Sequence, residues 1–338
     1  MKFLELCAGI GGFRQGLDNL GCECVGYSEI DKHAIKLYSH FYNDFNNLGD
    51  VTKINADTLP DFDILAGGFP CQAFSVAGKR LGFDDIRGTI FFDFARILKA
   101  KKPTFAIFEN VKGLLNHDGG KTYGTILKTL DECGYDAQWG VLNTRFHGLP
   151  QNRERVYIIA NLRKRSATKI LFEAGASSSH KVETRDNIIG HYYTASGKTH
   201  QGGEVIDSQG VAPCLLATDY KRSRMVKIGA IDGNKSQANR VYSVDGLAPT
   251  LSAQSGGLGA KTGLYNVNNS VRRLTPKECF RLQGFKDEMV DLGYKLEISD
   301  TQLYKMAGNA VSVPVVEWVA KRVLGWDKLR NLKNEYLF

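Results

Sequence analysis

The chain has 338 residues, of which 43% are hydrophobic and 24% charged, and its formal net charge at pH 7 is +8. No apolar run approaches the ~18 residues that a membrane-spanning helix needs, and the first residues are too polar for a secretion signal. The seven cysteines are scattered without metal-ligand spacing, so we expect a cytoplasmic protein with reduced thiols, no disulfide and no metal site.

Strand-like and helix-like runs alternate from the start of the chain to about position 160, which is typical of a doubly wound α/β sheet. Strands are predicted at residues 2–6, 24–28, 62–66, 105–108 and 156–160, and a helix at 13–20. Polar residues follow each of the last three strands. We expect these clusters to line one edge of the sheet, where ligands bind in this architecture.

A glycine loop follows the first strand. Gly9 and Gly11 open a helix, and Glu29 ends the next strand, a spacing that suits a nucleoside cofactor with the acid on its ribose. Arg14 stands where a dinucleotide loop needs a third small residue, which disfavours a nicotinamide cofactor. Asp50 ends a third candidate strand, where it could meet an adenine amino group. S-adenosylmethionine, an adenosine compound without a pyrophosphate, fits these residues.

A single cysteine follows the strand at 62–66, in the sequence Gly68-Phe69-Pro70-Cys71-Gln72-Ala73. The end of a parallel strand, opening into a loop over the crevice, is where a nucleophile is expected. A buried cysteine in a glycine turn is the plainer alternative for this residue taken alone. The loop at 80–87 carries glycines and basic residues, and we expect it to close on a substrate as a lid.

Charged side chains stand at the ends of two further strands. Glu109 follows an apolar strand, where partial burial would raise its pKa and let it donate a proton, unless a salt bridge satisfies it. Alternation places Arg153 and Arg155 on one face at the start of a strand. Two guanidinium groups there suit an anionic or carbonyl-rich substrate, and a surface charge ladder is the alternative.

The texture of the sequence changes near position 180, where Gly, Ser, Thr and Asn become frequent. Two similar segments, 205–217 and 241–253, form a repeat and predict two strand–turn–strand units packed side by side. Helical patterning returns at Thr275-Pro276-Lys277-Glu278, a capping-type start. A last apolar helix, at 313–324, is predicted to pack on the first part of the chain.

The excess positive charge is confined to one segment. Residues 161–275 contain 16 Lys or Arg and 8 Asp or Glu, whereas the rest of the chain contains 28 of each. A basic segment of this kind is either an ordinary solvated face or a surface that lies on a polyanion. We favour the polyanion.

Together these segments resemble the DNA (cytosine-5) methyltransferases of the compact bacterial restriction–modification type. The resemblance runs in order through nearly the whole chain and is carried by the motifs at 6–14, 68–75, 87–92, 109–111, 151–155, 272–279 and 304–311. Pro-Cys-Gln, Glu-Asn-Val and Gln-x-Arg-x-Arg in this order are highly specific. Two departures are mild. Cys7 stands where the family usually has an aromatic ring near the cofactor, and Ile30 where it often has one beside adenine.

The resemblance implies the reaction and its catalytic residues. Such an enzyme flips a target cytosine out of duplex DNA, attacks C6 with the thiolate of Cys71 and transfers a methyl group from S-adenosylmethionine to C5, leaving S-adenosylhomocysteine. Glu109 would hold the N3 edge of the base and share a proton there. Arg155 would meet the cytosine O2, and Arg153 would brace the site and the active-site loop.

The resemblance also implies two sets of binding residues. The cofactor contacts would be Cys7, Gly9, Gly11, Glu29, Ile30, Asp50, Val51, Pro70, Asn309 and Val311. The DNA contacts would be Ser75, Arg87, Gln237, Arg240, Thr250, Gln254 and Gly257. Arg240 is the first candidate for reading a guanine, because an arginine offers two donors to guanine O6 and N7.

The same resemblance divides the chain into two domains. Residues 1–180 plus 301–338 would form the catalytic and cofactor-binding domain, and 181–300 a smaller β-rich target-recognition domain whose phosphate contacts give salt-sensitive affinity. We expect a monomer, because one flipped base needs one active site. A cognate restriction endonuclease would act separately.

Two other functions stay open from the sequence. The enzyme could act on RNA, as tRNA-type relatives with similar catalytic residues do, although their recognition region is less elaborate. The fold could also serve a DNA-binding regulator without activity. The intact Cys71, Glu109, Arg153 and Arg155 argue against that regulator, since a decayed site would show losses.

Overall fold

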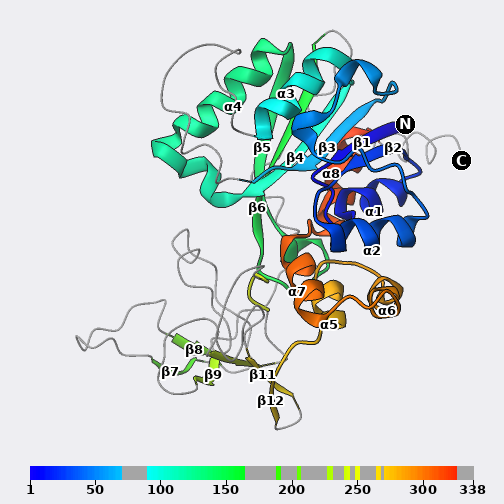
Figure 1. Cartoon of the computed structure of the whole chain (residues 1–338). Coiled ribbons are helices and arrows are strands. Elements are labelled where there is room, and N and C mark those ends of the chain that lie inside the picture. Colours follow the sequence, from blue (N-terminus) through cyan, green and yellow to red (C-terminus); the bar gives the residue numbers. More distant parts are fainter. Residues whose placement is uncertain are drawn as a thin grey trace, which may run out of the picture.

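Figure 1 shows the computed structural model of the chain, which describes residues 1–70, 90–163, 188–191, 204–206, 227–230, 240–243, 248–251, 264–267 and 270–325. Among these residues, no helix is both long and apolar enough to cross a membrane.

A six-stranded sheet organises the first part of the chain, in the order β2-β1-β3-β4-β6-β5. Its strands are β1 (Lys2–Leu6), β2 (Glu23–Ser28), β3 (Ile64–Gly68), β4 (Phe105–Val111), β5 (Tyr135–Asn143) and β6 (Glu154–Leu162). The first four run parallel, whereas β6 pairs antiparallel with both β4 and β5. The five predicted strands and the α/β class are confirmed, and β5 is an addition that the sequence analysis missed.

The antiparallel course of β6 decides which of its ends lies at the ligand edge. The carboxyl ends of β1, β3 and β4 share one edge of the sheet, and β6 begins there, with Arg155 paired to Val111. The polar residues at this edge therefore precede 156–160 in the chain. The expectation that the cluster following this strand would lie at the same edge is wrong, because that expectation assumed a parallel strand.

Helices cover both faces of the sheet (Figure 1). Alternate residues of β4 point to opposite faces, as the strand period requires. Ala106 and Phe108 pack with α3 (Ile90–Lys101) and α4 (Lys121–Glu132), whereas Phe105 and Ile107 pack with α1 (Gly12–Asp18) and α8 (Val313–Val323). The predicted packing of the last helix on the first part of the chain is therefore confirmed.

Three helices, α5 (Pro276–Arg281), α6 (Asp287–Lys295) and α7 (Asp300–Asn309), share one apolar cluster with Ile10 and with α2 (Lys32–Tyr42). The start of α5 is confirmed as a capping box, in which Thr275 and Glu278 bond to each other's backbone N–H groups. The same cluster also contains Ala248, Leu251 and Tyr265, so the predicted domain boundary at position 300 stays a prediction.

Short strands make up most of the described part of the chain between β6 and α5. They are β7 (Ile188–His191) and β8 (Glu204–Ile206), which pair together, and β9 (Lys227–Ala230), β10 (Arg240–Ser243), β11 (Leu264–Val267) and β12 (Ser270–Arg273), in the order β12-β11-β10-β9. The two copies of the repeat contribute β8 and β10 to different sheets. Residues 248–251 of the second copy form only a bridge, between Ala248 and Gln151, so the predicted second strand is wrong there.

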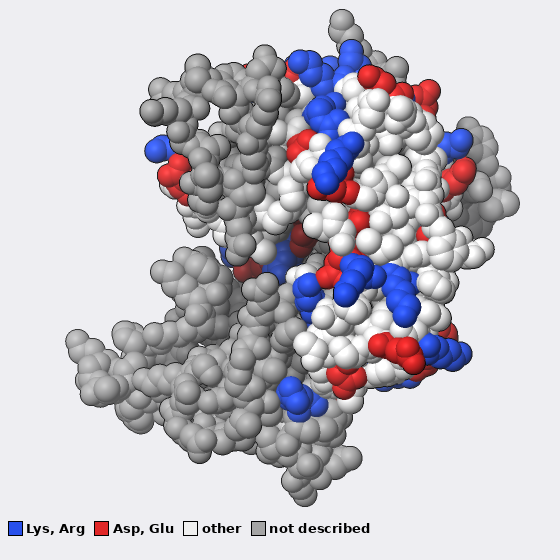
Figure 2. All heavy atoms as spheres, viewed as in Figure 1, with Lys and Arg blue, Asp and Glu red and all other residues white. Residues whose placement is uncertain are grey.

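Figure 2 shows Lys and Arg interspersed with Asp and Glu on the face viewed. No broad area of one sign covers the described residues of this face. The basic segment at 161–275 falls largely outside the described ranges, so its predicted contact with a polyanion stays a prediction.

Candidate active site

The residues predicted for the site divide into those that the structure describes and those that it does not. Cys71, Ser75, Arg87, Gln237, Gln254 and Gly257 lie outside the described residues. Arg240 begins β10, for which the backbone alone is described. Pro70 is the last described residue before Cys71, two positions after the end of β3. The remaining candidates lie at the ends of β1, β2 and β4, at the start of β6, and in three loops.

The glycine loop between β1 and α1 adopts a left-handed backbone at Cys7, Gly9 and Gly11, with φ of 51°, 56° and 82°. At Gly11 the glycine is required for space as well as conformation, since an added Cβ would lie 2.6 Å from the ring of Tyr42. The Tyr42 hydroxyl donates to the Gly11 carbonyl at 3.0 Å. At Gly9 an added Cβ would meet no atom of the described residues within 4 Å, so open space lies over that position of the loop.

Glu29 joins the glycine loop to the start of α2. Its Oε2 accepts a hydrogen bond from the Gly9 N–H at 2.7 Å, and its Oε1 accepts from the N–H groups of Ile30 and Asp31, both at 2.8 Å. The structure thus brings the predicted acid to the predicted loop. The Ile30 side chain beside it is 72% exposed.

Asp50 does not end a strand, so that part of the sequence analysis is wrong. It caps the short 3-10 helix η1 (Val51–Lys53), with its Oδ1 accepting from the backbone N–H and the hydroxyl of Thr52 at 3.0 and 2.8 Å. These two hydrogen bonds lower the pKa of Asp50. The Ser28 hydroxyl donates to Gly49 at 2.6 Å, which holds this cap beside the end of β2.

The turn between α7 and α8 brings Val311 to the start of α1, directly after the glycine loop, while Asn309 ends α7. A Cβ added to Gly12, the first residue of α1, would lie 2.7 Å from the Val311 carbonyl oxygen and 3.1 Å from its Cβ. The two segments come from opposite ends of the sequence and touch at this point. The described cofactor candidates thus gather at one end of β1 and β2.

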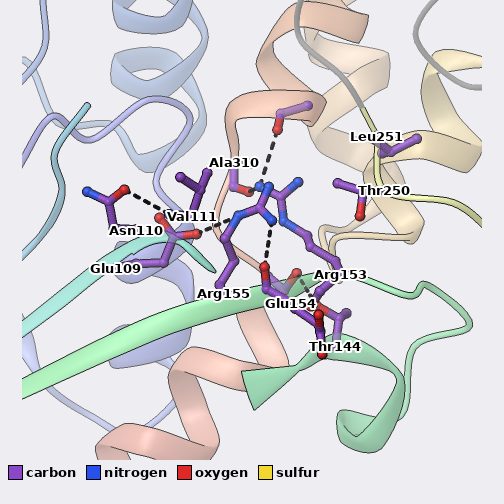
Figure 3. A network of polar contacts seen from close by, with 12 residues as sticks. Glu109, Asn110, Val111, Thr144, Arg153, Glu154, Arg155, Thr250, Leu251 and Ala310 are labelled. Atoms are coloured by element: carbon purple, nitrogen blue, oxygen red, sulfur yellow. Dashed lines mark hydrogen bonds and ion pairs between the residues drawn. The ribbon is translucent and has the colours of Figure 1, made fainter. Parts of the chain in front are cut away.

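The second half of the site pairs an acid with an arginine. Arg155 Nε lies 3.1 Å from Glu109 Oε1, across the junction of β4 and β6, and the two side chains are only 15% and 12% exposed (Figure 3). A Cβ added to Gly68, at the end of β3, would lie 3.3 Å from Glu109 Oε2. Glu109 therefore stands beside the strand that leads to Cys71 and also has the ion-pair partner that the sequence analysis gave as its alternative role.

Arg153 is 2% exposed, and its side chain lies on the same side of the chain as that of Arg155 (Figure 3). Its Nη2 donates to the carbonyl oxygens of Gly308 and Ala310, at 3.2 and 2.9 Å. Burial, and then the charge of Arg155, lower its pKa to about 9. Its Nε and Nη1 have no hydrogen-bond partner among the described residues, which is costly for a buried charged group, so these two donors require an acceptor from outside those residues.

Thr250 lies beside the arginines. Its hydroxyl donates to the Asn152 carbonyl at 2.8 Å, while Ala248 exchanges backbone hydrogen bonds with Pro150 and Asn152. Gln151 is fully buried and donates from Nε2 to the Leu282 carbonyl at 2.8 Å. The segment at 248–251 is therefore tied directly to the residues that precede Arg153.

Asn110 belongs to the motif at 109–111, but the sequence analysis gave it no role in the site. It is buried, and its Nδ2 donates to the Phe69 carbonyl at 2.8 Å, which fixes the end of β4 against the chain just before Cys71. Its signal in the sequence is its position next to Glu109, at the end of an apolar strand. A polar residue there has no solvent to bond and must bond to a neighbouring element.

A sequence profile of the C-5 cytosine-specific DNA methylases matches residues 1–325. The type II methyltransferase M.HhaI of Haemophilus parahaemolyticus is 38% identical over 326 residues, which are 96% of this chain and 94% of that protein. The type II methyltransferase M.NgoBI of Neisseria gonorrhoeae is 38% identical over 324 residues, 95% of this chain and 92% of its own length.

Solved structures share the fold. The Dnmt2 methyltransferase of S. pombe superposes with a TM-score of 0.65 at 19% identity, over 96% of this chain and 98% of that one. The ordered motifs and the profile that spans them agree with this likeness. The chain therefore belongs to the C-5 cytosine-specific DNA methylase family and is a DNA (cytosine-5) methyltransferase.

Proposed function

We propose that the chain methylates one cytosine within a specific double-stranded DNA sequence, with S-adenosylmethionine as the methyl donor. The observation that carries this proposal is the group formed by Glu109, Arg155 and Arg153 at the edge of the sheet where the glycine loop also lies. The Glu109 carboxylate and the Arg155 guanidinium match the polar edge of a cytosine, and Arg153 braces the site beside them.

The residues around the glycine loop, which form the first half of the site, fit the cofactor. An exposed apolar side chain at Ile30 suits the face of an adenine, the carboxylate of Glu29 suits ribose hydroxyls, and the space over Gly9 leaves room for a ligand close to the backbone. Asn309 and Val311 would close the site from the other side. When bound, S-adenosylmethionine supplies an electrophilic methyl group.

The protein's part in the reaction is to make cytosine C5 nucleophilic. In the proposed mechanism the Cys71 thiolate adds to C6, which breaks the aromaticity of the ring and turns C5 into an enamine carbon. Glu109 hydrogen-bonds the N3 edge and shares a proton there, so that negative charge does not build up on the ring. Arg155 meets O2. Once C5 carries the methyl group, loss of the C5 proton and departure of the Cys71 thiolate restore the ring.

Arg153 holds the site rather than the base. Its Nη2 is engaged with the turn between α7 and α8, and its Nε and Nη1, unpartnered within the described residues, are available to the active-site loop or to the substrate. Its charge, together with that of Arg155, would also lower the pKa of a thiol brought close to the two guanidinium groups.

Target recognition is proposed for residues 181–300, with Arg240 contacting a guanine. Replacing Arg240 by alanine should relax the choice at one base pair and cost about 1–3 kcal/mol of binding free energy. An unchanged methylated sequence in that variant would remove Arg240 from the recognition residues.

We further propose a modification enzyme of a restriction–modification system, acting as a monomer in the cytoplasm where bacterial DNA lies. The relatives described above are named type II methyltransferases, whereas M.SPRI of Bacillus phage SPR, 32% identical, is named an orphan methyltransferase. Expression in a host should protect the host DNA from an endonuclease that cleaves the same sequence only when it is unmethylated. Light scattering tests the monomer.

The first experiment maps 5-methylcytosine by conversion sequencing, after incubating the protein with S-adenosylmethionine and unmethylated genomic DNA. We expect one short sequence to be fully methylated, Cys71→Ser to abolish the signal, and Cys22→Ser to keep it. Methylation of RNA alone would favour the RNA-modifying alternative. Binding of DNA without methylation of either substrate would favour the regulator.

A further inference from the structure

The turn formed by residues 308–312 lies between the two halves of the site. On one side the Val311 carbonyl is packed against Gly12, directly after the glycine loop. On the other side the carbonyl oxygens of Gly308 and Ala310 accept hydrogen bonds from Arg153 Nη2 (Figure 3). We call the glycine loop and the start of α1 the cofactor edge. A displacement of the turn at this edge would therefore move the carbonyl groups that hold Arg153.

Ser312, at the end of this turn, is used in an unusual way. It occupies the N-cap position of α8, where a serine hydroxyl normally accepts a hydrogen bond from the first turn of its own helix, but its side chain makes no such bond. The hydroxyl donates instead to Gln283 Oε1 at 2.7 Å and lies 3.1 Å from the Thr144 hydroxyl. Ser312 is 2% exposed, so water does not compete for these bonds.

Thr144 carries the connection back to Arg153. Its backbone N–H donates to the Arg153 carbonyl at 3.0 Å, and its hydroxyl lies 3.3 Å from the same oxygen. Arg153 is thus held at both ends by one turn, through its carbonyl by way of Thr144 and Ser312, and through its guanidinium by way of Ala310.

Gln283 fixes the far side of the turn. It is fully buried, and its side-chain Nε2 donates to the Ala307 carbonyl at 2.9 Å. Its backbone carbonyl accepts from the Val313 N–H, also at 2.9 Å. With Ser312 on its Oε1, this side chain spans the whole turn from α7 to α8. Both polar atoms of its side chain are paired, and a satisfied network of this kind holds a single arrangement.

We infer that Ser312, with Thr144 and Gln283, is a positioning residue that couples the cofactor edge to Arg153 through the turn at 308–312. This inference rests on the proposed function, because the cofactor edge is defined by it. Binding at either half then reinforces the single arrangement of the turn on which both halves depend. By linkage, DNA should tighten cofactor binding by the same factor as cofactor tightens DNA binding.

The test measures the Kd of S-adenosylhomocysteine by calorimetry, once without DNA and once with DNA that contains the sequence the enzyme methylates. It also measures kcat. Ser312→Ala and Thr144→Val each delete one hydroxyl of the connection, while Thr144→Ser retains it. Ser299→Ala is the matched control, since Ser299 is also an N-cap serine without a side-chain cap, but exposed. We expect the enhancement by DNA to fall about fivefold or more in Ser312→Ala and Thr144→Val, with a lower kcat.

The retained hydroxyl in Thr144→Ser should restore both quantities, and Ser299→Ala should match the wild type. The inference is overturned if Ser312→Ala and Thr144→Val lower only the melting temperature, and show the wild-type enhancement and kcat at assay temperatures well below melting. A wild-type protein that methylates no DNA would count against the proposed function instead. The two failures are therefore distinguishable.

Discussion

The two halves of the site use their polar groups in opposite ways. In the cofactor half, Glu29 accepts hydrogen bonds from three backbone N–H groups of nearby loops, and Asp50 caps the short helix that follows it. In the base half, Glu109 and Arg155 pair across two strands, and Arg153 keeps Nε and Nη1 without partners in the described part of the chain.

This difference separates residues that fix the shape of the binding site from residues that take part in the reaction. Acids that bond to nearby backbone fix the form of a loop before any ligand arrives, which lowers the entropy that binding must overcome. A buried guanidinium with unused donors is satisfied only when an acceptor enters. Changes in the first half should therefore act on cofactor affinity, and changes in the second half on the methyl-transfer step.

The sharpest test of this separation is Glu109→Gln. It keeps the shape of the side chain but removes the acid–base group and half of the ion pair with Arg155. We expect single-turnover methylation to slow by about 10²–10⁴-fold, because a positioned proton-transfer group contributes that much. The Kd of S-adenosylhomocysteine should stay within about twofold of the wild-type value.

Glu154→Gln is the matched control for that variant. Glu154 lies one residue before Arg155 and pairs with Lys112 at 2.9 Å, with 35% of its side chain exposed. We expect its methylation rate to stay near the wild-type rate. If Glu109→Gln weakened cofactor binding as much as it slowed methylation, the two halves would not be separable.

Glu29→Ala tests the other half. The substitution leaves the N–H groups of Gly9, Ile30 and Asp31 without their acceptor and removes the proposed ribose contact. Hydrogen bonds to a charged group contribute about 1.5–3 kcal/mol, so the Kd of S-adenosylhomocysteine should rise about 10- to 100-fold. At saturating cofactor, kcat should change little. Glu23→Ala, at the exposed start of β2, is the control, and a fall in kcat with unchanged Kd would contradict the assignment.

The comparison also explains what the sequence could and could not predict. β1 and α8 were predicted almost to the residue, because their apolar patterns are local and their faces are buried. The direction of β6 was not, because pairing with β4 is decided by contacts between distant parts of the sequence, such as Val111 with Arg155. Ser312 likewise has a plain helix-start signal, and only the fold shows that its hydroxyl bonds elsewhere.

The site residues follow the same rule. Cys71, Glu109 and the two arginines stand out because each follows or opens an apolar strand. The structural roles of Asn110, Gln151 and Thr144 could not be predicted, although the first two belong to recognised motifs, since these roles depend on partners far away in the chain: Phe69, Leu282 and Ser312. Asp50 was wrongly predicted to end a strand, because an aspartate that caps a helix and one that ends a strand have the same local sequence signal.

Arg153→Lys asks whether the unpaired donors of the base half matter. A lysine ammonium can still bond to Gly308 and Ala310, but it lacks the planar fork that presents Nε and Nη1 elsewhere. We expect kcat to fall about tenfold with a small change in melting temperature, since one hydrogen bond from the charged group to the active-site loop or the substrate is lost. A wild-type kcat in this variant would show that these donors serve no acceptor in the reaction.

Glu5, on β1 beneath the glycine loop, gives the smallest effect and tests the cofactor half by pH. It is fully buried, and its oxygens accept from the Arg14 N–H at 3.2 Å and the Tyr38 hydroxyl at 2.9 Å. Burial raises its pKa to about 8. The folded pKa thus exceeds that of the unfolded chain, so the stabilising contribution of the protonated form is complete below about pH 4.5 and is lost as the pH rises through 8.

Between pH 7 and pH 8 this loss is about 1 kcal/mol of unfolding free energy. Glu5→Gln mimics the protonated carboxyl at every pH, and its amide can still bond to Tyr38, so urea unfolding at the two pH values should show a flatter dependence than the wild type. Glu23→Gln, which changes an exposed acid near the same sheet, should keep the wild-type slope. Equal slopes in Glu5→Gln and the wild type would mean that Glu5 is already ionised beneath the loop. The cofactor half would then hold its shape with a buried charge, as the base half does.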